Sequence, residues 1–363
     1  MITIMIASIV HCYVGCNTGS EDLQALHVLE CNTETGAAKI VQSVKGIQGT
    51  TYFQVDKEGK YLYSVIGEKR DAKSVGSVVR FPIDGWKLGE MERISDLPSE
   101  APCHVTLTPD GKRVACAAYT SGTASTVGID GKGLASYVFP NDAMGPNPKR
   151  QKKAYAHQTF YLPDGTLGIV DLGCDRIRFF DPATMKPAPV ADVTFDPGEG
   201  PRHVIWSKDG RHLFVLCELS SRVYSFAYDG KAFARVGKWT MLPADADRRD
   251  ADNSSENTKA AAIKLSADGK VLMASNRGHD SIALYAVDVE TGRLTLKNVA
   301  KLTGKFPRDF ELMPGEKFMV VGHKMSDEIQ VYRFDRDAFT LTPAGAPIAA
   351  WRPLCFKFLP AEK

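Results

Sequence analysis

Residues 202–217 read RHVIWSKDGRHLFVLC, an apolar segment followed by a short polar turn and a second apolar segment. The turn is built on Asp209-Gly210, the residue pair that a tight hairpin needs, because glycine adopts a positive φ without steric cost. Both apolar segments are too short for helices and rich in β-branched and aromatic residues. The stretch therefore predicts a β-hairpin.

The hairpin pattern recurs along the chain. Its six copies occupy residues 51–65, 103–118, 157–171, 202–217, 261–275 and 308–322. The turn glycines lie 45 to 59 residues apart, at Gly59, Gly111, Gly165, Gly210, Gly269 and Gly315. A period near 50 residues built of short strands predicts a β-propeller.

Each hairpin is followed by two more strand-like segments, as in Arg222–Tyr228 with Ala232–Trp239. A turn signal, Tyr228-Asp229-Gly230 in this unit, lies between them. Each unit is therefore predicted to form a four-stranded antiparallel blade.

The two chain ends supply the parts of one more blade. Leu354–Leu359 resembles an inner strand, and Ile9–Val14, Ala25–Glu30 and Ala38–Val44 resemble the three outer strands of a blade that lacks its first. Joined, they would close the ring and remove its exposed edge. We therefore predict an all-β, seven-bladed β-propeller, formed as one domain by residues 1–363. A tandem β-sandwich remains an alternative, whereas no long 3.6-residue period supports an α/β fold.

Composition excludes several classes of partner. The 363 residues are 44% hydrophobic and 24% charged, and 45 Lys and Arg against 43 Asp and Glu leave a formal charge of only +2, which disfavours a nucleic-acid partner. The apolar stretch Met1–Val10 is too short to span a bilayer and lacks a basic segment before it, so we expect no membrane association. Eight scattered cysteines without a Cys-x-x-Cys pair indicate reduced thiols in a cytoplasmic protein.

Propeller geometry gathers particular polar residues. The start of each inner strand and the end of the second strand lie on the same face, around the mouth of the central channel. Alignment of the units on their turns places these charged residues there: His157, Arg202 and Arg308 at strand starts, and Asp171, Glu218, Arg277 and His323 near strand ends. Three arginines, two histidines and two carboxylates in a concave mouth favour an anionic ligand. Buried ion pairs that hold the blades together are the alternative interpretation.

Neighbouring segments extend this picture. His104 and His203, one residue further into their strands, could contact a ligand or serve in packing. The insertions Asn141–Ala156 and Pro243–Lys259 both precede inner strands, so they should lie over the mouth as rims or as solvated loops. The basic residues of the first insertion would attract a phosphate or carboxylate.

Six motifs carry a family resemblance. They are Ala-His-Gln (156–158), Asp-Leu-Gly-Cys-Asp-Arg (171–176), Gly-Glu-Gly-Pro-Arg-His (198–203), Glu-Leu-Ser-Ser (218–221), Ser-Asn-Arg-Gly-His-Asp-Ser-Ile (275–282) and Phe-Pro-Arg-Asp-Phe (306–310). Together they resemble the lactonase family of seven-bladed propellers, typified by the cycloisomerase-type 6-phosphogluconolactonases. The first 150 residues match only in outline, since Val-Ile-Gly-Glu (65–68) and Ala-Ala-Tyr-Thr (117–120) stand where the family usually has Asn-Glu and Ala-Asn-Tyr.

The resemblance implies hydrolysis of 6-phosphogluconolactone to 6-phosphogluconate in the pentose phosphate pathway of carbohydrate metabolism. The family also includes fungal carboxy-muconate lactonizing enzymes, whose proposed catalytic residues are a His, an Arg, a Glu and a second Arg. By similarity of motif these roles fall on His157, Arg202, Glu218 and Arg277. Substrate-binding candidates are then Arg308, His323, Asp171, His104 and His203.

Lactone hydrolysis requires a base for water and donors for the oxyanion. Either His157 or Glu218 could be the base. Nearby arginines should lower the pKa of Glu218 and make it weakly basic, so we favour His157 slightly, with Arg202 and Arg277 stabilising the oxyanion. No Gly-x-Ser-x-Gly motif supports a serine acyl-enzyme, and we expect no cofactor and no metal.

Two other functions remain open. The same residues could close a lactone on a muconate-type dicarboxylate, or the propeller could be a non-enzymatic scaffold for protein partners. A scaffold has no need of Arg, His and Glu concentrated in its channel. The expected partner is therefore a small anionic lactone or carboxylate, bound by a monomer or homodimer.

Overall fold

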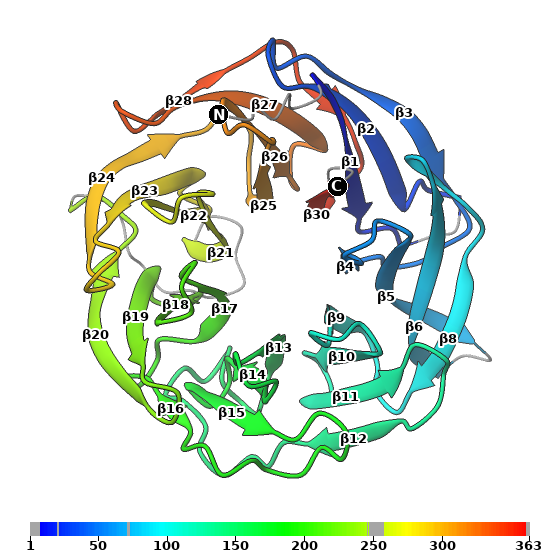
Figure 1. The fold of residues 1–363 in the computed structure, drawn as a ribbon, viewed down its shortest axis with the longest axis vertical. Coiled ribbons are helices and arrows are strands. Elements are labelled where there is room, and N and C mark those ends of the chain that lie inside the picture. Colours follow the sequence, from blue (N-terminus) through cyan, green and yellow to red (C-terminus); the bar gives the residue numbers. More distant parts are fainter. Residues whose placement is uncertain (1–7, 20–21, 71–72, 245, 247–257, 361–363) are drawn as a thin grey trace, which may run out of the picture.

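The computed structural model describes residues 8–19, 22–70, 73–244, 246 and 258–360, and these form seven antiparallel sheets around a central channel (Figure 1). The predicted seven-bladed β-propeller is confirmed. None of the described residues forms a helix that could span a membrane.

The blades follow one another in chain order. Blade 1 contains β4 (Tyr52–Val55), β5 (Tyr61–Arg70), β6 (Lys73–Asp84), β7 (Lys87–Leu88) and β8 (Glu92–Leu97). Blade 2 contains β9 (Pro102–Leu107), β10 (Arg113–Ala118), β11 (Thr123–Gly128) and β12 (Ala135–Val138). Blade 3 contains β13 (Ala156–Tyr161), β14 (Leu167–Asp171), β15 (Arg176–Phe180) and β16 (Val193–Thr194). Blade 4 contains β17 (Pro201–Trp206), β18 (His212–Cys217), β19 (Arg222–Tyr228) and β20 (Phe233–Thr240).

The remaining blades complete the ring. Blade 5 contains β21 (Lys259–Leu265), β22 (Val271–Arg277), β23 (Ser281–Val287) and β24 (Leu294–Lys301). Blade 6 contains β25 (Pro307–Leu312), β26 (Phe318–His323), β27 (Glu328–Asp335), β28 (Thr340–Pro343) and β29 (Ile348–Ala349). Blade 7 contains β30 (Pro353–Phe358), β1 (Ile9–Cys16), β2 (Leu26–Asn32) and β3 (Ala38–Val44), so both chain ends close it as predicted.

Two blades depart from four strands because their outer strand is interrupted. β7 and β8 both pair with β6, and β28 and β29 both pair with β27. Gly345, at φ +75°, lies between β28 and β29 and turns the chain there.

The Asp-Gly turns form as the sequence predicts. In blade 4, Gly210 adopts φ +71°, and the carboxylate of Asp209 accepts hydrogen bonds from the Arg211 amide and the Ser207 hydroxyl. The Ser207 amide donates to the His212 carbonyl at 2.8 Å, which begins the β17–β18 ladder. The hairpin is therefore specified locally.

Buried apolar side chains join each blade to the next. Between blades 3 and 4, Phe160 and Val170 pack with Val215 and Tyr224. At the closure of the ring, Phe356 of β30 belongs to a cluster shared by blades 6 and 7. Closure therefore rests on an apolar core as well as on strand pairing.

A bulge recurs at the start of the inner strands. Pro201 pairs with Cys217 and His203 with Leu216, which leaves Arg202 without a partner in the ladder. In four other blades the same irregularity falls on the equivalent residue: Cys103, His157, Arg308 and Leu354. A regular strand sends successive side chains to opposite faces, whereas a bulge redirects them. The bulges therefore determine which side chains the mouth of the channel receives.

Candidate active site

The mouth of the channel holds a cavity of about 360 Å³, the mouth cavity, on the face predicted from the repeat. Its wall includes Cys103, Arg150, His157, Glu218, Arg277 and Arg308. Three of these are the bulged residues of blades 2, 3 and 6. The next residues along two bulged strands, His104 and His203, line deeper cavities, so each bulge turns two successive side chains toward the channel.

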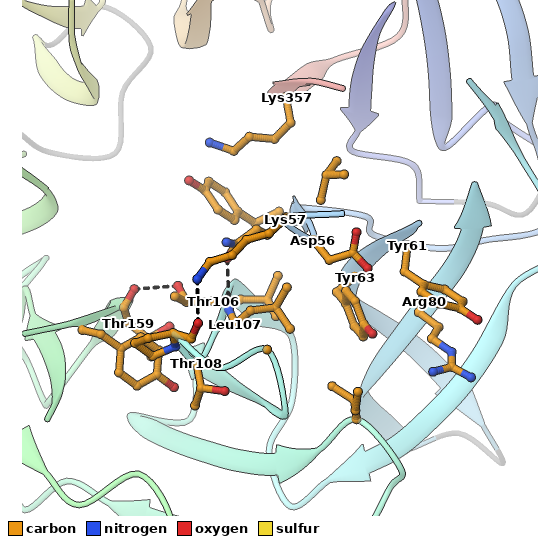
Figure 2. Close-up of a pocket in the computed structure, with 18 of the residues that line it drawn as sticks. Asp56, Lys57, Tyr61, Tyr63, Arg80, Thr106, Leu107, Thr108, Thr159 and Lys357 are labelled. Carbon is orange, nitrogen blue, oxygen red and sulfur yellow. Dashed lines mark hydrogen bonds between the residues drawn. The ribbon is translucent and has the colours of Figure 1, made fainter. Parts of the chain in front are cut away.

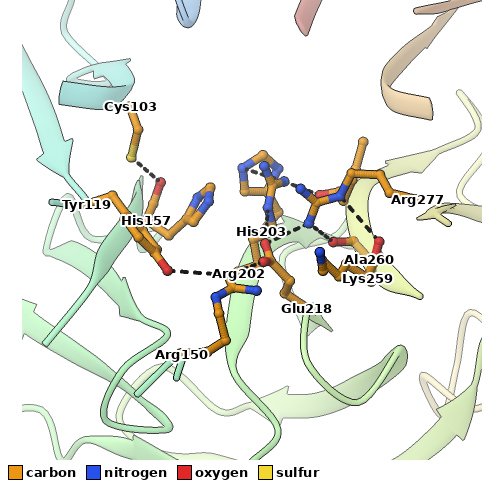
Figure 3. A network of polar contacts seen from close by, with 12 residues as sticks. Cys103, Tyr119, Arg150, His157, Arg202, His203, Glu218, Lys259, Ala260 and Arg277 are labelled. Atoms are coloured by element: carbon orange, nitrogen blue, oxygen red, sulfur yellow. Dashed lines mark hydrogen bonds and ion pairs between the residues drawn. The ribbon is translucent and has the colours of Figure 1, made fainter. Parts of the chain in front are cut away.

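Glu218 lies at the centre of the polar network in Figure 3, immediately after β18. Its amide donates to the Gly200 carbonyl at 2.7 Å, and its carbonyl accepts from the Ala260 amide at 3.1 Å. These two bonds fix the backbone of Glu218 between blades 4 and 5.

Three guanidinium groups neutralise the Glu218 carboxylate. Oε2 pairs with Arg202 at 2.9 Å and with Arg277 at 2.8 Å, and Oε1 accepts from Arg150 at 2.5 Å. Burial alone would raise the pKa of Glu218, but the three arginines hold it well below its ordinary value. Glu218 is therefore ionised and weakly basic.

Arg150 comes from the insertion before β13. An Asn147 turn orders this segment, since the Asn147 side chain accepts the Arg150 amide at 3.0 Å. Gln151 then donates to the Leu172 carbonyl at 3.0 Å. The Arg150 guanidinium also donates to the Tyr119 hydroxyl, whose pKa burial and the nearby Glu218 raise to about 12. This part of the insertion is a wall of the mouth cavity and not a solvated loop.

His157 faces the same cavity with no protein hydrogen bond to its ring from any described residue. Its Nδ1 atom is buried, which leaves Nε2 as the nitrogen open to the cavity. Burial, followed by the positive charge of Arg202, lowers its pKa well below the ordinary value, and the opposing effect of Glu218 is smaller. The imidazole is therefore neutral at physiological pH and can accept a proton.

The side chain of Arg308 makes no ion pair and no hydrogen bond with any residue that the structure describes. It lines the mouth cavity, and its pKa is lowered by burial and by the neighbouring Arg277. Arg202 differs, because it is only 2% exposed, pairs with Glu218 and donates to the Ala261 carbonyl. Arg308 is available to an incoming anion, whereas Arg202 lies behind Glu218.

A layer of aromatic rings lies deeper in the channel. The His203 ring is 5.2 Å from His157 and 5.8 Å from His104, and His104 stacks on Tyr52 at 4.1 Å. Burial is the main cause that lowers the pKa of His104 and His203 well below the ordinary value. These neutral rings lie below the mouth cavity and away from its wall.

Besides Arg202, His104 and His203, two more of the sequence candidates lie away from the wall of the mouth cavity. Asp171 is fully buried, and its Oδ1 atom accepts the amides of Tyr155, Gly173 and Cys174, which holds the chain between blades 2 and 3. His323 is also buried and its Nε2 atom contacts the Tyr332 hydroxyl at 3.2 Å within blade 6. Substrate contact by Asp171 and His323 stays a prediction of the sequence, and these contacts instead support structural roles for both side chains.

Several residues of the wall, among them Arg150, Tyr119 and Cys103, were not among the predicted site residues. Arg150 was recognised only as part of a basic insertion, and Tyr119 and Cys103 only by alignment of the repeat. The signal that could have identified Cys103 is its equivalence to His157 and Arg202. Most of the other insertion, 243–259, lies outside the described residues.

A larger cavity of about 980 Å³ lies at the other end of the channel, beside the Asp-Gly turns (Figure 2). Its polar side chains are largely satisfied within the protein: Lys57 donates to the Pro109 carbonyl and Thr106 to the Thr159 carbonyl. Among the described residues, this larger cavity has no pair of unpartnered side chains equivalent to His157 and Arg308 of the mouth cavity. Across the described part of the chain, no group of three His, Cys, Asp or Glu side chains could hold a metal ion.

Comparison with known proteins places these features in a family. The model of the lactonase family, described as a seven-bladed β-propeller, matches residues 11–358. The 6-phosphogluconolactonase of Bacillus subtilis is 29% identical over 358 residues, 96% of this chain and 97% of that protein. The 6-phosphogluconolactonase of Formosa agariphila is 29% identical over 336 residues, 89% of this chain and 92% of that protein.

A solved structure agrees with these relatives. The periplasmic gluconolactonase of Pseudomonas aeruginosa superposes with a TM-score of 0.85 at 26% identity, covering 97% of this chain and 99% of that one. The fold, the repeat motifs and the match over 11–358 all lead to one assignment. The chain belongs to the lactonase family of seven-bladed β-propellers.

Proposed function

We propose that this protein is a lactonase that hydrolyses a sugar lactone, foremost 6-phosphogluconolactone, in the mouth cavity. The observation that carries the proposal is one cavity that holds a neutral His157 and an Arg308, whose side chains have no hydrogen-bond or ion-pair partner among the described residues. These groups supply the base and the positive charge that hydrolysis of a lactone requires. The names of the relatives from B. subtilis, F. agariphila and P. aeruginosa support the same substrate class.

The reaction would begin when His157 accepts a proton from water. The resulting hydroxide attacks the lactone carbonyl carbon, and the carbonyl oxygen becomes an oxyanion. Arg308 would stabilise this charge together with Arg277, whose Nη1 atom has no partner among the described residues. The ring C–O bond then breaks, and the leaving oxygen takes the proton from His157. Water is consumed and one carboxylic acid is formed.

Glu218 and Arg202 have supporting roles in this proposal. Three ion pairs on Glu218 argue against its accepting a proton from water. Instead, Glu218 would hold Arg277 beside the substrate, with Arg202 buried behind it. The preference for His157 as base rests on this difference in partners, because three arginines bind the Glu218 carboxylate and no described residue hydrogen-bonds the His157 ring.

The test is lactone hydrolysis by the purified protein, followed as proton release above the spontaneous rate. We expect turnover of 6-phosphogluconolactone by the wild type and a loss of about 10²–10⁴-fold in His157→Gln. His11→Gln is the matched control, because His11 stacks on Trp86 at the start of β1 in blade 7. Wild-type rates no greater than the spontaneous rate would contradict the proposal.

Muconate-type dicarboxylates belong in the same assay, followed by ultraviolet absorbance. If the protein converts a muconate and hydrolyses no sugar lactone, its reaction is lactone formation and not lactone hydrolysis. A cytoplasmic location and a monomeric or homodimeric state remain predictions of the sequence.

A further inference from the structure

The side of the mouth formed by blades 5 and 6 carries positive charge that the Glu218 network does not neutralise. The guanidinium group of Arg308 on β25 has no ion pair or hydrogen bond among the described residues. Lys324, which follows β26, is partly buried, and its backbone amide donates to the Phe306 carbonyl at 3.1 Å. Its ammonium group likewise has no ion pair or hydrogen bond within the part of the chain that the structure describes. Two partly buried cations that lack an anionic partner among the described residues are costly unless a ligand supplies the missing charge.

Phe306 places Lys324 relative to the reaction centre. The Lys324 ammonium lies 5.7 Å from the centre of the Phe306 ring, and the Arg277 guanidinium lies 5.3 Å from the same centre. The two cations therefore share one aromatic neighbour. Because Arg277 also pairs with Glu218, Lys324 belongs to the surroundings of the mouth cavity and not to the outer surface of blade 6.

The Phe306 ring is held in position by its backbone. Phe306 has φ +64°, a conformation that bulky residues rarely adopt, and the carboxylate of Asp280 accepts its amide at 2.8 Å. Pro307, the first residue of β25, follows directly. The ring that Lys324 and Arg277 both contact is thus attached to a constrained segment immediately before the unpartnered Arg308.

A lactone ring explains only part of this charge. The oxyanion formed on the carbonyl carries one negative charge, and the hydroxyl groups of a sugar carry none. Arg308 and Lys324 together exceed what the reaction centre needs, so they fit a fixed dianionic group elsewhere on the substrate. A phosphate monoester has this charge, and charge-assisted hydrogen bonds to its oxygens are strong.

We propose that Lys324, together with Arg308, forms a phosphate subsite that makes the mouth cavity selective for phosphorylated over unphosphorylated sugar lactones. The proposal rests on the proposed lactonase function and names Lys324 as its specificity-determining residue. Lys324 binds the remote phosphate, while His157 and Arg277 act on the lactone group.

The subsite should depend on pH. The positive groups that act on Lys324 are Arg308 on β25, Arg352 before β30, Arg277 on β22 and Lys259 on β21. Burial, followed by these charges, lowers the pKa of Lys324 to about 8. Lys324 is therefore charged at neutral pH and loses its charge above about pH 8, whereas an arginine in its place would remain charged.

The experiment compares KM for 6-phosphogluconolactone and for gluconolactone. Lys324→Met should raise KM for the phosphorylated lactone by about 10- to 100-fold and leave kcat, and KM for gluconolactone, unchanged. Lys324→Arg should restore the wild-type KM. Lys305→Met is the matched control, because it removes an exposed lysine one residue before Phe306.

Titration with inorganic phosphate separates failure of this proposal from failure of the lactonase proposal. Phosphate affinity should be lower in Lys324→Met than in the wild type. Between pH 7 and pH 9 the phosphate affinity of the wild type should fall, whereas that of Lys324→Arg should not. If the wild type hydrolyses neither lactone yet shows this Lys324-dependent phosphate binding, the subsite stands and the lactonase function is wrong. If Lys324→Met changes KM equally for both lactones, or leaves phosphate affinity unchanged, the subsite is wrong.

Discussion

Replacing Glu218 by Gln keeps the shape of the side chain and removes the one negative charge shared by Arg150, Arg202 and Arg277. Glu218 is 3% exposed and the three arginines are at most 7% exposed. Removing one partner from a buried ionic network typically costs about 3–5 kcal/mol, because the remaining charges stay buried without compensation. We therefore expect Glu218→Gln to lose about that much free energy of unfolding at neutral pH.

The same reasoning gives a pH dependence. The folded-state pKa of Glu218 lies well below its unfolded value of about 4.3, so its stabilisation is fully present above that pH. It is lost as the pH falls further, through the folded-state pKa. The difference in stability between wild type and Glu218→Gln should therefore be largest near neutral pH and shrink in acid.

Urea unfolding at pH 7 and in acid measures both effects. Glu92→Gln is the control, since the Glu92 carboxylate is 45% exposed and pairs with Arg80 at 2.7 Å. An exposed pair contributes only about 0–1 kcal/mol. A Glu218→Gln protein no less stable than Glu92→Gln would refute the view that Glu218 neutralises the arginines.

Three other predictions concern the closure of the propeller, the packing of the insertion before β13 and the binding of phosphate by Arg308. Deleting residues 353–363 removes β30 with Phe356, so we expect insoluble or molten protein by near-ultraviolet circular dichroism, and a truncated chain as stable as the full one would show that closure is unimportant. Gly173→Ala would place a Cβ atom 1.8 Å from the Lys153 carbonyl oxygen, displacing the insertion, so it should cost about 1–3 kcal/mol or more in urea unfolding. Gly19→Ala, which meets no atom within 4 Å, is its control, and equal stability of the two would contradict the packing argument. Arg308→Met should weaken inorganic phosphate binding by about 10- to 100-fold in calorimetry without changing the fold, and unchanged affinity would make Arg308 structural.

The repeat could be predicted from the sequence because each hairpin is specified locally. Asp209-Gly210 and its equivalents place a glycine where a positive φ is required, and the six copies fix the period. The N-terminal end has three outer strands but no inner strand, and the C-terminal end has one inner strand with no outer strands. Together these two parts identify the blade that closes the ring. The interruption of the outer strands of blades 1 and 6 was not predicted, because outer strands pair on one side only and carry weak patterns.

The mouth was predicted from the repeat, but the orientation of two of its candidate residues was not. Alignment places Asp171 and His323 beside Glu218, yet Asp171 accepts backbone amides and His323 contacts Tyr332. Which way a side chain turns at a strand end depends on the local turn, and the aligned sequence does not contain that information. Arg150 was missed as a site residue because it lies in an insertion that has no counterpart in the repeat, so alignment of the repeat could not place it at the mouth.

The bulges explain why alternation alone misplaces channel residues. Arg202 and His203 are neighbours in sequence, yet both reach the channel, because Arg202 is left unpaired between two ladder positions. A strict period of two would have sent one of them into the blade. The position of a bulge depends on how a strand pairs with its neighbour in the blade. The sequence of one strand alone therefore does not predict it.

The pH dependence of kcat/KM for lactone hydrolysis, measured in wild type, His157→Gln and Glu218→Gln, tests most directly whether His157 is the base of this site. Because burial and Arg202 lower the pKa of His157, the acidic limb of the wild-type profile should lie below the ordinary histidine value of about 6.5. We predict that this limb disappears in His157→Gln and persists in Glu218→Gln. A limb that survives in His157→Gln and disappears in Glu218→Gln would contradict the account.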